Sequence, residues 1–376
     1  MSVRRSRTPG GHVSSRRSNG TIVGVVALSI SLVALVGLTF IPTQYVIQRP
    51  GPVFDTLGTA KGSDGASVPL IEVKDAKTYP TGGTLDLTTV QVIGNRQRTP
   101  TWFELALAWF DPSRAVVPID AVFPEGVTSE QRDQQNAALM VDSQHEATAA
   151  ALTELGYDVG AQVEVVSVLK DSPAEGLLKD GDRILAIDGV DVNSATLLRD
   201  TIQKAKGSEV TLSVKRGSET DTVAITPKKT KDASGATTWL IGITLTTDYT
   251  FPVDVKLQLD NVGGPSAGMM FALGIIDTLT PGELNGGVNV AGTGTIDAAG
   301  DVGPIGGIRQ KLFGARDAGA TVFLAPESNC DEVVGHIPDG LKVFKTATLQ
   351  DSLDILEVIA DHGDTSKLPV CTASAK

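Results

Sequence analysis

An uncharged apolar segment near the start of the chain places the strongest constraint on its fold. The twenty residues from Ile22 to Ile41 contain no charged side chain, and a helix of that length spans about 30 Å, the thickness of the hydrocarbon core of a bilayer. Five arginines and no acidic residue lie among residues 1–20. Because cytoplasmic flanks carry the excess of basic residues, the pattern predicts a cytoplasmic tail over residues 1–20 and a transmembrane helix over residues 21–43, with the rest of the chain outside the cytoplasm.

Two other interpretations compete with a membrane anchor. A buried helix of a soluble domain is usually shorter and amphipathic. A cleaved signal peptide has a shorter apolar region that is followed by a site of small residues, whereas TFIPTQYV ends this run. The sequence therefore favours an uncleaved, single-pass anchor in the cell membrane.

The remaining composition limits the classes of site and partner. The 376 residues carry a formal net charge of -12, which argues against nucleic acid as a partner, because phosphate binding needs basic patches. The four histidines and two cysteines form neither an HExxH nor a CxxC motif, so we expect no metal site and no cofactor. Cys330 and Cys371 lie outside the cytoplasm in this topology, so we predict a disulfide between them, the alternative being two buried thiols.

Residues 163–226 have the alternating strands, tight turns and capped helix of a small β-rich domain. Their most informative segments, SPAEGLLKDGDRILAIDG and VTLSVKRG, resemble bacterial PDZ domains, and we assign residues 159–246 to such a domain. No Gly-Φ-Gly-Φ loop precedes Val163, but WLIGITL at 239–245 is placed as in circularly permuted PDZ domains. The resemblance implies a loop there to which a peptide adds as a strand at the sheet edge. This loop consists of Leu240, Ile241, Gly242 and Ile243.

A single serine stands in the small-residue segment GGPSAG at 263–268, directly before an apolar run. Serine at a helix start often caps the first backbone N–H groups, and that interpretation of Ser266 stays open. The serine can also be a nucleophile if a nearby base removes its proton, with the helix N-terminus supplying N–H groups for an oxyanion. Nothing local connects His145, His336 or His362 to this serine as a Ser-His-Asp triad would require.

Lys311 belongs to the apolar stripe of a helix expected over residues 308–319. The stripe at helical spacing is Ile308, Lys311, Leu312, Ala315 and Ala318, and the other side carries Arg309, Gln310, Arg316 and Asp317. A lysine in such a stripe either extends its amine to water or is held in a dry site, where burial lowers its pKa and makes it a base near neutral pH. Spacing alone leaves both interpretations open.

Three motifs in order resemble the proteolytic domain of Lon proteases: GGPSAG at 263–268, AGTGTI at 291–296 and GPIGGIRQKLFGARDAGATVFLAPESN at 303–329. Those enzymes hydrolyse peptide bonds with a Ser-Lys dyad. The resemblance implies Ser266 as the nucleophile, Lys311 as the general base and Thr293 as the residue that orients the lysine. The substrate and oxyanion region would include Gly264, Pro265 and Ala267.

The chain departs from the Lon pattern in three respects. Lon enzymes often carry an acid where Gly264 stands and a glutamate where Thr295 stands. These changes alter the polarity of the site but keep the dyad. No G-x-x-x-x-G-K-[ST] motif occurs either, so we expect a peptidase that works without ATP.

The resemblance extends to GGTLDLTTV at 82–90 and ALMVDSQHEATAAALTELG at 138–156, which look like the opening strand and first long helix of the same domain. The expected fold class is therefore α+β: a Lon-type proteolytic domain of mixed sheet and helices, interrupted by a PDZ domain and preceded by one transmembrane helix. Residues 44–158 would hold a linker and the first part of the Lon-type domain, residues 247–362 its main part, and residues 363–376 a C-terminal tail.

Together these features predict an ATP-independent, membrane-anchored serine endopeptidase that cleaves extracytoplasmic proteins, with the PDZ domain binding or gating the substrate. The resemblance to Lon enzymes also implies a homo-oligomeric ring, a hexamer. The alternative is a catalytically silent scaffold or adaptor, in which the PDZ domain recruits a partner on a Lon-type fold.

Overall fold

The computed structural model describes residues 19–38, 41–61, 65, 67–231, 237–259 and 262–372. Its main body contains a six-stranded mixed sheet in the order β20-β19-β16-β5-β1-β6. These strands are β1 (Tyr45–Asp55), β5 (Thr84–Ile93), β6 (Ala115–Pro118), β16 (Asn289–Gly292), β19 (Val322–Pro326) and β20 (Lys342–Thr346). β5 pairs with β1 in antiparallel and with β16 in parallel. Segments from both sides of the PDZ-like region therefore share one sheet.

Helices cover both faces of this sheet, because its strands alternate apolar side chains between two cores. Leu324 of β19 lies in the core that includes α4 (Ser129–Glu154), α6 (Gly268–Leu279) and α9 (Leu349–Ala360). Its neighbour Phe323 lies in the core that includes α7 (Ile308–Asp317) and α8 (Cys330–Val333). Because α6 and α7 lie on opposite faces of the sheet, their side chains can meet only beyond the end of a strand.

Residues 160–250 form a second sheet with a core of its own. Its order is β11-β10-β8-β7-β14, and β9 pairs with β8. The elements are β7 (Gly160–Val168), β8 (Arg183–Ile187), β9 (Val190–Asp191), helix α5 (Ala195–Ala205), β10 (Val210–Arg216), β11 (Glu219–Ile225) and β14 (Ile243–Thr250). β14 follows the other strands in the chain but lies at the edge of the sheet beside β7, which makes it available for strand addition.

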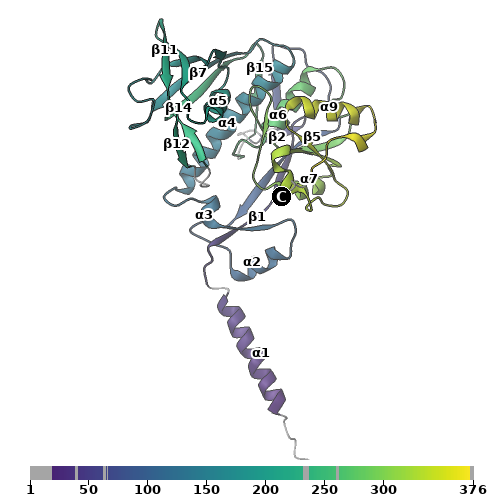
Figure 1. Cartoon of the computed structure of the whole chain (residues 1–376). Helices are drawn as coiled ribbons and strands as arrows, with labels where there is room; N and C mark the ends of the chain where they lie inside the picture. Colours follow the sequence, from purple (N-terminus) through teal and green to yellow (C-terminus); the bar gives the residue numbers. More distant parts are fainter. Residues whose placement is uncertain are drawn as a thin grey trace, which may run out of the picture.

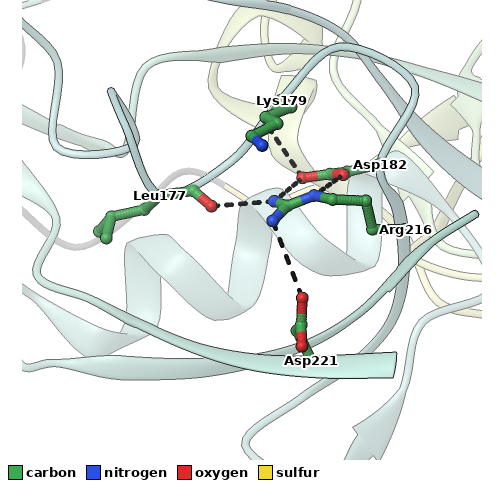
Figure 2. Close-up of polar contacts among 5 residues, drawn as sticks. All are labelled: Leu177, Lys179, Asp182, Arg216 and Asp221. Atoms are coloured by element: carbon green, nitrogen blue, oxygen red, sulfur yellow. Dashed lines mark hydrogen bonds and ion pairs between the residues drawn. The ribbon is translucent and has the colours of Figure 1, made fainter. Parts of the chain in front are cut away.

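A buried ion pair fixes the turns of this second sheet (Figure 2). The side chain of Asp182 is 1% exposed and accepts two hydrogen bonds from Arg216, at 2.8 Å from Nε and 2.6 Å from Nη2. Nη2 also donates to the carbonyl of Leu177 at 3.1 Å, while the N–H of Lys179 donates to Asp182 at 2.8 Å. Asp221 Oδ2 lies 3.7 Å from Nη1. The hydrogen bonds from Arg216 are the main reason why the pKa of Asp182 is lowered.

Shorter elements complete the described chain. They are β2 (Thr59–Lys61), β3 (Ser67–Pro69), β4 (Ile71–Lys74), α2 (Trp102–Trp109), α3 (Ile119–Val122), β12 (Lys228–Lys231), β13 (Thr237–Leu240), β15 (Asp254–Leu257), β17 (Thr295–Ile296), β18 (Val302–Gly303), and the 3-10 turns η1 (Glu327–Asn329) and η2 (Thr365–Lys367). A disulfide joins Cys330, the first residue of α8, to Cys371.

The segment after residue 44 differs from the linker or extended lead-in that its proline and glycine content predicts. It forms β1, which pairs with β5 on one side and with β6 on the other. The register shifts between Pro50 and Val53. Such an irregularity is how a sheet accommodates proline, which has no N–H for the ladder.

Helix α1 (Asn19–Leu38) projects from the main body (Figure 1). Its large apolar side chains from Ile22 to Val33 are at least half exposed. Within the described residues, no helix is both long and apolar enough to cross a membrane. Residues 1–18, 39–40 and 373–376, on which the predicted basic tail and parts of the predicted span and C-terminal tail fall, lie outside the described residues.

Candidate active site

Ser266 lies at the amino end of α6, but its side chain does not cap the helix. The N-cap residue is Ala267, and no side-chain hydrogen bond caps this end. Ser266 Oγ instead lies 2.8 Å from Nζ of Lys311. No histidine forms a hydrogen bond with Ser266 in the part of the chain that the structure describes. The geometry therefore favours the Ser-Lys interpretation over the helix-cap and triad interpretations.

Lys311 reaches this serine from α7, on the other face of the sheet. Its side chain is only 2% exposed, so the amine does not extend to water. Burial lowers the pKa of Lys311 from 10.5 to about 7, because the ammonium form loses its hydration. Gln310, which the spacing places on the polar side of the helix, is also buried. That expectation is wrong because α7 packs against β1 and β5 as well as β19.

Thr293 follows β16 at its carboxyl end and links the lysine to the backbone of the serine. Its side chain is fully buried. Thr293 Oγ1 lies 2.8 Å from Lys311 Nζ and donates a hydrogen bond of 2.9 Å to the carbonyl of Ser266. A hydroxyl has one proton to donate, so Thr293 can only accept from the amine. This arrangement fixes one amine N–H and leaves the lone pair of a neutral amine free to face Ser266 Oγ.

Two residues of α4 position the loop that precedes α6. The N–H of Gly264 donates to the carbonyl of Asn136 at 2.9 Å, and Ser143 Oγ donates to the carbonyl of Pro265 at 2.9 Å. The predicted oxyanion region contains Gly264, Pro265 and Ala267. The N–H of Gly264 is already hydrogen-bonded and proline has no N–H, so the N–H of Ala267 is the one left to bind an oxyanion. Sequence reasoning missed Asn136 and Ser143, because their only relevant contacts are to residues far away in the chain.

The dyad opens onto a cleft of about 800 Å³, which is large enough for an extended peptide. Ser266 and Lys311 line it, together with residues of β1 and β5 and the apolar side chains of Met140, Leu259 and Val262. In the described part of the chain no group of three or more His, Cys, Asp or Glu side chains is placed to hold a metal ion.

Comparisons with known proteins match the two parts of the chain separately. Residues 260–360 match the model of the Lon protease (S16) C-terminal proteolytic domain, and residues 128–226 match a PDZ domain model. The chain is 37% identical over 109 residues to Lon protease of Frankia alni and 36% identical over 91 residues to Lon protease 1 of Bacillus subtilis. These stretches cover 27% and 24% of this chain, but only 12% and 11% of the two relatives.

The chain carries a Lon-type proteolytic domain and a PDZ domain. Both resemblances are thereby confirmed. Among solved structures, the chain is similar to the PDZ domain of the SdrC-like protein from Listeria monocytogenes, at 36% sequence identity over 22% of this chain and 85% of that one, with a TM-score of 0.20. The PDZ match starts at residue 128, although residues of α4 from Met140 onward pack in the core of the Lon-type domain.

The PDZ domain has a groove of about 240 Å³ between α5 and its edge strand β14. Its lining includes all four residues of the predicted loop: Leu240, Ile241, Gly242 and Ile243. The carbonyls of residues 241 and 242 accept hydrogen bonds from the backbone of residues 169–174, so they are engaged by the neighbouring loop. Gly242 has a φ of 81°, and a Cβ there would lie 2.2 Å from Ser172. Only glycine fits this close approach.

Proposed function

We propose that this protein is an ATP-independent serine endopeptidase with Ser266 as nucleophile and Lys311 as general base. The observation that carries the proposal is the 2.8 Å contact between Ser266 Oγ and the amine of a lysine that is 2% exposed. A serine hydroxyl needs such a base, and an amine with a pKa near 7 is neutral often enough to act as one.

The reaction follows from the positions of these groups. Neutral Lys311 takes the proton of Ser266 as Oγ attacks the scissile carbonyl, and a C–O bond forms. The N–H of Ala267, at the positive end of α6, faces the developing oxyanion. The intermediate collapses when the C–N bond breaks and the Lys311 ammonium gives its proton to the departing amine. Lys311 then deprotonates a water that hydrolyses the acyl-enzyme, and the proton returns to Ser266.

We further propose that the PDZ domain binds an extended peptide segment or a free C-terminus along β14. A cavity of about 520 Å³ supports a link between this groove and the catalytic serine, because its lining includes Thr247 of β14, Thr196 of α5 and Pro265. A peptide along β14 would therefore run towards the loop that positions Ser266. This placement suits a domain that presents or gates the substrate.

The proposed location is the outer face of a cell membrane, with α1 as the anchor. The apolar side chains of α1 are exposed on the helix surface from Ile22 to Val33, and an isolated helix that is apolar all round needs an apolar environment. The disulfide between Cys330 and Cys371 supports an oxidising compartment. Substrates would then be flexible or unfolded extracytoplasmic proteins. The hexameric ring stays a prediction of the resemblance, which the mass of the purified particle would test.

Cleavage of an unfolded protein such as reduced casein, without ATP, tests the peptidase proposal. Ser266→Ala should remove the activity, a loss on the order of 10⁶-fold for a serine nucleophile, while the melting temperature stays close to that of the parent. Ser218→Ala changes an exposed serine of the β10–β11 turn and serves as the matched control. Activity that persists in Ser266→Ala would overturn the assignment. A parent that binds C-terminal peptides but turns over no substrate would instead favour the scaffold alternative.

A further inference from the structure

Helix α2 is apolar on two opposite sides, and the protein covers only one of them. Leu105 and Ala108 are buried and pack against Ile47 of β1. A capping box at Thr101 starts the helix, with the Glu104 side chain accepting from the Thr101 N–H at 2.7 Å. The helix is therefore held firmly by its inner side and its first turn.

The outer side of α2 exposes large side chains. Phe103 is 51% exposed, Leu107 53% and Phe110 87%. They stand at i, i+4 and i+7, so they share one face, and Trp109 beside them is 65% exposed. Single exposed apolar residues are common on soluble proteins. Three aromatic side chains and a leucine on this short helix and its C-cap residue, Phe110, together mark an interaction surface.

The position of α2 identifies what can cover this surface. The Thr43 hydroxyl donates to the carbonyl of Pro100 at 2.8 Å, and the Thr43 N–H donates to Thr99 Oγ1 at 3.2 Å. The start of α2 is thus tied to the chain just after α1. Leu38 and Thr43 are five positions apart in the chain, a distance of at most about 17 Å. α2 lies at the end of the body from which α1 projects (Figure 1).

We propose that α2 lies in the surface of the lipid bilayer, with Phe103, Leu107 and Phe110 among the headgroups and upper acyl chains. This inference rests on the proposed anchor, because the anchor sets the distance between α2 and the bilayer. Aromatic side chains are favoured at this depth. Glu104 is the only charged residue of α2. The binding of α2 to the bilayer should therefore depend on the burial of apolar side chains and not on anionic lipids. A second contact would stop the body from rotating about α1 and would hold the active-site cleft at a fixed orientation to the membrane.

Depth-dependent quenching in vesicles tests this surface. The full chain, with its disulfide intact, is reconstituted in phosphatidylcholine vesicles after a single exposed residue is changed to cysteine and labelled with an environment-sensitive fluorophore. Phe110→Cys reports on α2, Leu28→Cys on the anchor, and Thr222→Cys, on the exposed β11 strand, is the matched control. Spin-labelled lipids with shallow and deep nitroxides act as quenchers, and iodide reports access from water.

The proposal expects the label at residue 110 to be quenched several-fold more strongly by the shallow nitroxide than the label at residue 222, and to remain so when anionic lipid is added. Leu107→Ser should reduce that quenching and leave the label at residue 28 unchanged. If the nitroxide lipids quench the label at residue 28 but not the label at residue 110, the proposed membrane contact of α2 is overturned and the anchor is kept. Absence of quenching at residue 28 overturns the anchor and this proposal together. A label at residue 110 that neither iodide nor lipid reaches is covered by a second copy of the chain, which also overturns the proposal.

Discussion

At the scale of a single residue, the proposed mechanism makes two opposing demands on Lys311. Its amine must be dry enough to lose a proton near neutral pH, and it must still reach Ser266. Burial in α7 meets the first demand. Thr293 meets the second, because its hydrogen bond to the carbonyl of Ser266 makes the amine and the nucleophile share one rigid neighbour. In the proposed mechanism the threonine is thus a positioning residue that acts through the lysine.

The lowered pKa of Lys311 predicts the pH dependence of cleavage. The reaction needs the neutral amine, so kcat/KM should rise with pH and level off above about 7, with a fall of about tenfold per pH unit below that value. The unfolded lysine still binds a proton up to pH 10.5, so the folded state also becomes more stable as the pH rises from about 7 towards 10.5. A fluorogenic peptide assayed from pH 5 to pH 9, with the melting temperature recorded at each pH, checks the profile. A rate that stays flat or falls as the pH rises would show that another group is the base.

At the scale of elements, the contact between Arg216 and Asp182 joins β10 to the turn before β8 (Figure 2). Arg216→Met should leave a buried carboxylate without its partner and lower the unfolding midpoint of the PDZ domain, roughly by 5 °C or more. The pKa of Asp182 is lowered in the folded state, so the contribution of this pair is present above the unfolded carboxyl pKa and is lost as the pH falls through the folded value. The difference between parent and variant should therefore shrink in acid.

Arg183→Met is the matched control for that prediction. Arg183 lies on β8 of the same sheet and contacts Glu164 at 3.5 Å, but the carboxylate of this pair is 32% exposed, whereas that of Asp182 is 1% exposed. An ion pair that solvent reaches on both sides contributes little to stability, so this variant should melt close to the parent. Equal effects of the two substitutions would contradict the special role of the buried pair.

The elements that could be predicted from sequence are those with strong local signals. The long helix expected over residues 138–156 lies almost entirely within α4, whose capping box at Thr128 and Gln131 fixes its start. Ser266, Lys311 and Thr293 could be found because the glycines and small residues around them form motifs. The prediction of a linker after residue 44 was wrong. Pro50 and Gly51 weaken the local signal of a strand there, and that strand is stabilised by pairing with distant partners. Asn136 and Ser143 left no local signal, since they act only by contact with a loop more than a hundred residues later.

At the scale of the whole molecule, the chain has two folded units with different means of stabilisation. The PDZ domain has its own core and contains no cysteine, whereas both cysteines lie in or beside the Lon-type domain. Separate cores permit separate unfolding transitions. The disulfide should therefore raise the unfolding midpoint of one unit more than that of the other. Its reduction then tests whether the two units unfold together or separately.

Reduction of the disulfide should lower the unfolding midpoint of the Lon-type domain and leave that of the PDZ domain in place. Cys330 and Cys371 are 41 positions apart, and closing a loop of that length removes about 4 kcal/mol of chain entropy from the unfolded state, which corresponds to roughly 10 °C in the midpoint of such a domain. Scanning calorimetry with and without reductant measures the shift, and Arg216→Met identifies the transition that belongs to the PDZ domain. A variant with Cys330→Ser and Cys371→Ser should melt like the reduced parent and should not respond to reductant. A common shift of both transitions would contradict this prediction. It would mean that contacts between the domains couple their unfolding, although each has a separate core.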